Sequence, residues 1–404
     1  MKRVDITASG SEIQGNSDPI TAFSLPIPRN VLIDRAYLHV PFCFHKCHYC
    51  DFYSIVDARD RRDAFARRLA DEIRAAGPRL AQPLRSIFIG GGTPTLLDPE
   101  HWSVIGQALH DAWNIVDGTE FTVEANPETV TPEGVEALRA CGVNRVSVGA
   151  QSFDPRHLDT LERHHDPASV GRSVEILRRG GITRINLDLI FGIPGQTIED
   201  WARDLDAALS LQPEHLSCYG LTYEPGTAMT ARRDRGRIQP IDESIEADMF
   251  LLTRERLHAA GFDQYEISNW ARPGAECSHN LGYWRNESWW ALGPSAAAHV
   301  DGWRWRNVGR LTPYLESNHG PPIEEVECVA PSVRVGELLM LGLRLREGVA
   351  RSDLDAWLEV EGAAWRRDVL ADHQARGRLE WVDQRLRLTD HGLLMANEVI
   401  SDLL

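Results

Sequence analysis

Short apolar runs alternate with amphipathic segments between residues 35 and 260 of the chain. This alternation predicts strands separated by helices, because the amphipathic segments repeat apolar residues at three- and four-residue spacing. The predicted strands span residues 36–42, 86–90, 120–125, 145–149, 184–191 and 215–221. The predicted helices span residues 60–76, 99–113, 132–141, 168–179, 198–211 and 242–259.

Successive strand–helix units predict one parallel sheet with helices on its outer face. Six strands are too few for a closed eight-stranded barrel, so we expect an α/β fold with a partial (β/α)6 barrel. Such folds carry their functional residues on loops at the carboxyl ends of the strands. Polar or glycine-rich residues follow each predicted strand, such as Gly90-Gly91-Gly92 after the second. We therefore expect a functional site at this end of the sheet.

The chain divides into three predicted parts. Residues 1–34 are rich in Ser, Pro, Gly and Asn, which predicts a poorly ordered extension. Residues 35–270 form the predicted barrel, and residues 271–404 a smaller C-terminal region. That region has two helical patterns, a hairpin pattern and a last helical pattern, which predicts a small α+β, winged-helix-like domain.

Composition and charge narrow the function. The 404 residues carry a formal net charge of −16, which argues against an extended phosphate-binding surface and so against a nucleic-acid partner. Seven cysteines, an odd number with three clustered, do not fit a disulfide framework and favour a reducing compartment. The sequence shows no signal-peptide pattern and no 18-residue uncharged apolar stretch. We expect a cytoplasmic protein without a transmembrane segment.

Three cysteines directly follow the first predicted strand, at CxxxCxxC spacing: Cys43, Cys47 and Cys50. Three thiolates on so short a loop can converge on one metal centre. A [4Fe–4S] cluster normally takes four thiolates, so three leave one iron open to an exchangeable ligand. A structural zinc site would need a fourth ligand, for which His45 or His48 is available. Three unrelated cysteines are the remaining alternative.

Two further features suggest a ligand site. The run Gly90-Gly-Gly-Thr-Pro-Thr95 would let backbone N–H groups approach a ligand, or would simply form a tight strand-to-helix turn. Glu124 and Asp188 lie in otherwise apolar strands, where an unpaired carboxylate is costly to bury. Each faces a site, or else pairs with an Arg or Lys of the barrel.

Several stretches together resemble a known superfamily: YLHVPFC, KCHYCDF, GGGTPT, RVSVGAQSF, NLDLIFGIPGQT and YEPGT. They resemble the radical S-adenosylmethionine (SAM) superfamily and, within it, the heme chaperone HemW family, which is related to oxygen-independent coproporphyrinogen III oxidases. The resemblance covers residues 35–305 closely and residues 330–404 loosely. It implies a radical SAM barrel with a [4Fe–4S] cluster held by Cys43, Cys47 and Cys50. It also implies a set of SAM-binding residues: Tyr37, Gly91, Gly92, Thr93, Glu124, Gln151, Arg163 and Asp188.

Two positions separate the chaperones from the oxidases in this resemblance. The oxidases carry a further cysteine where this chain has Phe52, and the chaperones carry an HNxxYW motif, which here begins at His279. The resemblance implies that His279 binds heme, although a lone buried histidine is more often a hydrogen-bonded core residue. It further implies delivery of heme to an acceptor protein, an electron donor such as flavodoxin or ferredoxin, and transient contact with a membrane protein. The alternative is an oxidase that decarboxylates porphyrin propionates by radical chemistry.

Overall fold

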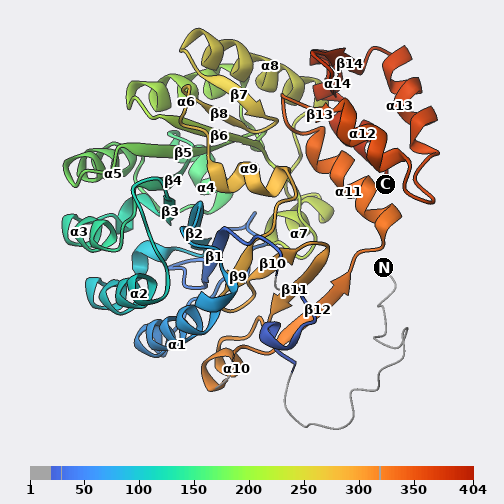
Figure 1. Ribbon diagram of the computed structural model, residues 1–404. Coiled ribbons are helices and arrows are strands. Elements are labelled where there is room, and N and C mark those ends of the chain that lie inside the picture. Colours follow the sequence, from blue (N-terminus) through green and yellow to red (C-terminus); the bar gives the residue numbers. More distant parts are fainter. Residues whose placement is uncertain (1–19, 29, 318–319) are drawn as a thin grey trace.

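In the computed structural model, which describes residues 20–28, 30–317 and 320–404, a nine-stranded sheet forms the centre of the molecule (Figure 1). Its strand order is β7-β8-β6-β5-β4-β3-β2-β1-β9. The six predicted strands lie side by side in chain order and pair parallel to one another: β1 (Arg35–Val40), β2 (Ser86–Gly91), β3 (Glu120–Ala125), β4 (Arg145–Gln151), β5 (Arg184–Phe191) and β6 (His215–Gly220). The partial (β/α)6 barrel is confirmed. Its edge strands β7 and β9 are not neighbours, so the sheet stays open.

Three short strands that the sequence did not predict extend this sheet. They are β7 (Asp263–Glu266), β8 (Asn269–Ala271) and β9 (Trp290–Leu292). Strand β8 pairs antiparallel with β6, whereas β9 pairs parallel with β1. Strands of three or four residues are too short to show an alternating pattern. Because β9 belongs to the main sheet, residues beyond the expected domain boundary at residue 270 also build the barrel.

Helices cover the outer face of the sheet (Figure 1). The predicted ones are α1 (Arg62–Ala76), α2 (Pro99–Ala112), α3 (Pro132–Ala140), α5 (Pro167–Arg179), α6 (Ile198–Ser210) and α8 (Glu243–Ala259). Thr131, Asp166 and Thr197 cap α3, α5 and α6 by accepting backbone N–H groups of the first turn. Among the helices between β1 and β7, the short α4 (Pro155–Leu161) and α7 (Ala228–Asp234) were not predicted. Within the described ranges, none of the helices has the length and apolar character needed to cross a membrane.

The N-terminal extension differs from its expectation over the part that the structure describes. Around the short helix η1 (Ala22–Ser24), Ala22, Leu25 and Ile27 are buried in the core, as is Ile33 further on. The Phe23 ring lies 5.7 Å from the ring of Trp290 in β9. The segment is therefore packed, because its few apolar residues cover the edge of the sheet. Residues 1–19 and 29, for which poor order was also expected, lie outside the described residues.

The C-terminal region is an α+β assembly, as expected. Helix α9 (Ser278–Trp284) precedes an antiparallel sheet of β10 (Ala297–Val300), β11 (Trp303–Asn307) and β12 (Ile323–Cys328), with α10 (Leu311–Glu316) between β11 and β12. A second small sheet contains β13 (Val349–Ala350), β14 (Leu379–Val382) and β15 (Arg385–Leu388). The accompanying helices are α11 (Pro331–Gly342), α12 (Arg351–Leu358), α13 (Arg366–Ala375), α14 (Asp390–Leu394) and α15 (Ala396–Ser401).

A buried glutamate joins α1 to the segment that contains β11 and α10. Glu72 accepts hydrogen bonds from the Tyr314 hydroxyl at 2.7 Å, from the Gly293 backbone N–H at 3.1 Å and from the Asn307 amide at 3.3 Å. Burial raises the pKa of Glu72 from 4.5 to about 7. The folded protein therefore binds a proton at Glu72 more tightly than the unfolded chain does.

Glu72→Gln should flatten the pH dependence of stability. Because the folded pKa is raised, the stabilising contribution of protonated Glu72 is complete below about pH 4.5 and is lost as pH rises through about 7. Between pH 5 and pH 8 the wild-type free energy of unfolding should fall relative to the variant, by about 3 kcal/mol at most. Urea titrations at both pH values measure this difference. Glu136→Gln, at an exposed position of α3, is the control, and parallel curves for Glu72→Gln and wild type would contradict the expectation.

Candidate functional site

A cavity of about 980 Å³ lies where the carboxyl ends of the parallel strands meet. Its wall contains most of the residues singled out in the sequence: Cys43, Cys47, Cys50, Gly91, Gly92, Thr93, Glu124, Gln151, Arg163 and Asp188. These residues come from six different loops or strand ends, which the parallel sheet brings to one rim. The C-terminal region closes another part of the wall with Arg344, Leu393 and Asn397. Tyr37 is not among the lining residues.

The cysteine loop is held in place by backbone hydrogen bonds. The Cys43 N–H donates to the Ile55 carbonyl at 2.9 Å, and the Met229 N–H donates to the His48 carbonyl at 2.9 Å. All three cysteines are free, and burial raises the pKa of the Cys50 thiol to about 11. Thiolates are therefore unfavourable here unless a cation compensates them. Cys218 of β6 also lines the cavity, but only Cys43, Cys47 and Cys50 share the short loop after β1. Three free sulfurs on one loop suit a metal cluster that keeps one position open.

The glycine run is required by packing rather than by exposed N–H groups. A Cβ atom on Gly90 would lie 2.6 Å from the Glu124 carboxyl group, and one on Gly92 would lie 2.6 Å from the Phe42 carbonyl oxygen. The backbone N–H groups are already used: Gly91 donates to Glu124 at 3.0 Å, Gly92 to the Val40 carbonyl at 2.8 Å. In this structure the glycines let β2 approach β1 and Glu124 closely, and ligand binding by Gly91 and Gly92 stays a prediction.

Two carboxylates project into the cavity from β3 and β5. Glu124 accepts the Gly91 N–H, while Asp188 accepts hydrogen bonds from the Ser147 hydroxyl and the Asn186 amide, both at 2.8 Å. Burial and the negative charge of Asp188 raise the pKa of Glu124 to about 7. Burial also raises the pKa of Asp188. Neither carboxylate forms an ion pair within the described part of the chain, so the pair favours a cationic ligand.

Arg163 and Gln151 lie together beside Gly149. The Arg163 guanidinium donates to the Gly149 carbonyl at 3.0 Å and lies 3.8 Å from the Cys47 sulfur. A Cβ atom on Gly149 would lie 2.8 Å from both side chains, so glycine is needed for this arrangement. Tyr37 lies behind the cavity wall, where its hydroxyl is 3.1 Å from His39 Nδ1 and its ring stacks on Phe88. Arg163 thus places positive charge next to the cysteine loop.

His279 has the surroundings of a core residue. Its side chain is fully buried, with Nδ1 2.8 Å from the Ser86 hydroxyl and Nε2 2.9 Å from the Tyr283 hydroxyl. Burial lowers the pKa of His279 to about 3. Ser86 begins β2, so His279 lies at the amino end of the strands, opposite the cysteine loop. In this structure neither ring nitrogen is free to coordinate a heme iron, which goes against the expectation for His279.

The HNxxYW motif, which contains His279, contacts β2 with one side and the cavity with the other. His279 and Tyr283 pack against β2, whereas Asn280 and Trp284 line the cavity. The sequence motif pointed to the histidine and, through its tryptophans, to Trp284 as a possible pocket residue, but not to Asn280 as a lining residue. Sequence reasoning also missed Glu246 and Glu266, which add acidic groups to the wall. Glu266 lies in β7, a strand too short to be predicted, so no local pattern indicated that it faces a cavity.

Comparison with protein families gives the class. A model of the Radical SAM superfamily matches residues 37–208, and a model of the HemN C-terminal domain matches residues 329–395. The chain is therefore a radical SAM protein that ends in a HemN-type domain. The coproporphyrinogen III oxidase HemN of Escherichia coli shares the fold, with a TM-score of 0.80 at 22% identity over 93% of this chain and 91% of that one.

Relatives over nearly the full length give the family. The chain is 38% identical to the heme chaperone HemW of Mycobacterium tuberculosis, with 91% of this chain and 94% of that protein covered. It is 36% identical to the heme chaperone HemW of Bacillus subtilis, covering 91% and 98%, and 32% identical to that of Escherichia coli, covering 90% and 96%. The chain belongs to the HemW family, as its sequence motifs indicated.

His279→Ala should lower the stability of the fold rather than remove a ligand-binding group from the cavity. It removes two buried hydrogen bonds and leaves a cavity beside the Tyr283 hydroxyl, whereas the Ser86 hydroxyl still accepts from Arg35; the loss should cost about 2–4 kcal/mol of unfolding free energy. Chemical denaturation measures this loss, with the exposed His258→Ala on α8 as control. Undiminished stability of His279→Ala would show that the side chain is not part of the core.

Proposed function

We propose that this protein is a heme chaperone, which binds heme and delivers it to an acceptor protein, and that it carries a [4Fe–4S] cluster and SAM. The observation that carries the proposal is the match of about nine-tenths of the chain to several heme chaperones of the HemW family. The reduced cysteines agree with a place in the cytoplasm. An electron donor such as flavodoxin or ferredoxin would reduce the cluster. The protein would contact a heme acceptor in a membrane only transiently.

The cavity wall supports the cluster and SAM assignments. Cys43, Cys47 and Cys50 would hold the cluster, whose open iron supplies one-electron chemistry on SAM when both are bound. Thr93 supports this loop, because its hydroxyl lies 3.7 Å from the Cys43 sulfur. Arg163, 3.8 Å from the Cys47 sulfur, adds a positive charge that favours thiolates and suits a carboxylate ligand.

Glu124 and Asp188 suit the positive groups of SAM. A sulfonium and an ammonium group would compensate the two carboxylates, whose pKa values are raised by burial and, for Glu124, also by the charge of Asp188. Gly91 and Gly92 form part of the wall, and Gln151 offers an amide beside it. The proposed SAM site is therefore this part of the cavity, with Tyr37 supporting it from behind through the β1 strand.

The alternative function is an oxygen-independent coproporphyrinogen III oxidase. Its fold is shared, but the position of the oxidases' further cysteine is taken by Phe52, whose side chain is 64% exposed. An additional thiol is therefore missing next to the cluster loop. Heme ligation by His279 would require α9 to leave its place against the strands, so we do not assign the axial ligand to His279.

Heme binding without porphyrin turnover is the expected outcome for the reconstituted protein. Hemin titrated into the protein should give a saturable Soret change, and the bound heme should pass to an apo-heme protein. With coproporphyrinogen, SAM and a reductant, no protoporphyrinogen should form. Fluorescence after oxidation of the porphyrins detects that product. Protoporphyrinogen formation at many turnovers, together with weak and unsaturable heme binding, would support the oxidase instead.

Glu124→Gln and Asp188→Asn should weaken SAM binding and leave the iron content intact. Each replacement removes a negative charge from the cavity while keeping the side-chain size, so roughly tenfold weaker binding is expected for each. Equilibrium dialysis with labelled SAM measures the affinity, and iron analysis measures the cluster. Asp206→Asn, at an exposed position of α6, is the matched control. Unchanged SAM affinity with a loss of stability would make the two carboxylates structural.

A further inference from the structure

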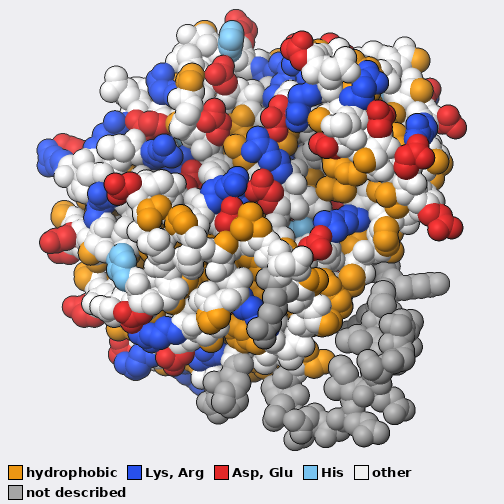
Figure 2. Space-filling model, viewed as in Figure 1, with side chains coloured by type: hydrophobic (Ala, Val, Ile, Leu, Met, Phe, Trp, Pro, Cys, Tyr) orange, Lys and Arg blue, Asp and Glu red, His pale blue; other side chains and the backbone are white. Residues whose placement is uncertain are grey.

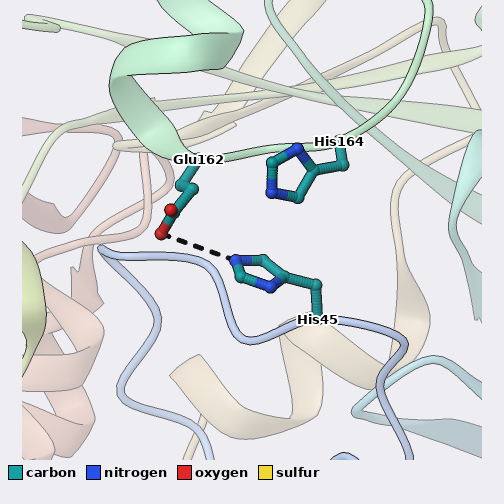
Figure 3. A group of neighbouring side chains, drawn as sticks. All are labelled: His45, Glu162 and His164. Carbon is teal, nitrogen blue, oxygen red and sulfur yellow. Dashed lines mark ion pairs between the residues drawn. The ribbon is translucent and has the colours of Figure 1, made fainter.

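Three metal-ligating side chains converge at the cysteine loop, and the cluster and SAM assignments above use none of them, although His45 also lines the cavity. They are His45, Glu162 and His164, and one ligand atom of each lies within 4.8 Å of those of the others (Figure 3). His45 comes from the loop between Cys43 and Cys47, whereas Glu162 and His164 come from the turn that ends α4. The His45 and His164 rings are 4.6 Å apart between centroids and steeply inclined.

The backbone on both sides of this cluster is fixed. Glu162 ends α4 in the left-handed conformation, with φ of 53°, and its N–H donates to the Asp159 carbonyl at 3.0 Å. The His48 N–H donates to the Leu161 carbonyl at 3.3 Å, which ties the cysteine loop to the same turn. The three side chains therefore face one another because two segments far apart in sequence are held together. Only side-chain rotations are needed to bring the donors onto one ion.

The donor set determines which ligand fits. Two imidazoles and one carboxylate are the ligands of catalytic zinc sites with an open position and of ferrous facial triads. A heme iron does not fit all three, because the porphyrin fills four positions and leaves two axial ones on opposite faces. Donors that converge from one side suit a bare cation.

The donors are only partly engaged: one Glu162 oxygen pairs with His48, whereas His45 Nε2 has no hydrogen-bond partner within the described part of the chain. His48 also pairs with the Glu162 carboxylate through Nε2, and its Nδ1 is 3.1 Å from the Arg232 guanidinium. His45 Nε2 is 3.5 Å from a Glu162 oxygen, beyond a good hydrogen bond. Arg163 lies between Glu162 and His164 in sequence, but its guanidinium is engaged with Gly149 and Cys47.

A second group of possible ligands shows the contrast. Asp154, His157 and Asp200 also lie within 4.8 Å of one another. There, however, Arg156 bridges both aspartates and Arg203 pairs with Asp200. The arginines already neutralise that group, so a cation would have to displace them.

We propose that His45, Glu162 and His164 bind one divalent transition-metal ion of the Zn²⁺ or Fe²⁺ class, separate from the cluster. Such an ion would cross-link the cysteine loop to the α4 turn, next to the arginine that contacts Cys47. The proposal does not depend on heme or on SAM binding. It concerns side chains of this chain that the cluster assignment does not use.

Zinc binding by the protein with its cluster in place tests the proposal. After incubation with Zn²⁺ and dialysis, metal analysis should find one zinc per chain in addition to the cluster iron. His45→Gln, Glu162→Gln and His164→Gln should each weaken zinc binding on the order of tenfold or more, as measured by competition with a chelating dye. His110→Gln, at an exposed position of α2, should bind zinc as the wild type does. Anaerobic competition between Fe²⁺ and Zn²⁺ shows which ion the site prefers.

The protein with Cys43, Cys47 and Cys50 replaced by Ala separates the two sites. It should lose the iron of the cluster and keep the zinc. If zinc binding is lost in the cysteine variant and persists in the histidine variants, the zinc is bound to thiolates and the proposal is overturned. The proposal is also overturned if the wild type retains neither Zn²⁺ nor Fe²⁺ beyond the cluster. The third contrary outcome is that the histidine variants lose heme uptake while their zinc binding is unchanged.

Discussion

Two buried carboxyl groups inside the barrel, those of Glu124 and Asp188, determine which kind of ligand the cavity favours. Glu124 and Asp188 project from β3 and β5 into the same cavity; burial and the negative charge of Asp188 raise the pKa of Glu124, and burial raises the pKa of Asp188. The polar groups around them, the Gly91 N–H and the hydroxyl and amide partners of Asp188, compensate only part of the cost of ionisation. A cationic ligand would supply the rest. The two carboxyl groups therefore match a cavity that holds a cationic ligand better than an empty one.

The other end of the barrel is closed by α9, and charge is again the reason. Arg35, buried at the start of β1, donates to Glu287 and to the Ser278 carbonyl. Glu120, at the start of β3, accepts the backbone N–H groups of Ser278 and His279, both at 3.0 Å, and so compensates the positive end of the helix. With α9 held in this way, Asn280 and Trp284 reach the cavity. The HNxxYW segment thus links the C-terminal region to the proposed cofactor site.

One architecture serves two kinds of protein in this comparison. The coproporphyrinogen III oxidase HemN shares the fold along most of both chains, while the curated relatives with higher identity are heme chaperones. The fold alone therefore does not decide between oxidation of a porphyrin and its transport. On the face of the molecule drawn in Figure 2, basic and acidic side chains are interspersed, with hydrophobic side chains between them. What separates the two functions must lie in side chains near the cluster, such as Phe52, and in the ligands of the heme.

The sequence by itself determined the six parallel strands, the cysteine triplet and the two acidic residues inside apolar strands. Each of these features is a pattern of residues that are close together in the sequence. Periodicity needs five or more residues to show, so the three-residue strands β8 and β9 were visible only once they paired with β6 and β1. Only the tertiary structure showed that His279 is a hydrogen-bonded core residue, because its partner Ser86 belongs to a strand that is distant in sequence. It likewise decided that His45 meets Glu162 and His164. Contacts between distant segments leave no local pattern, and for that reason only the folded chain shows them.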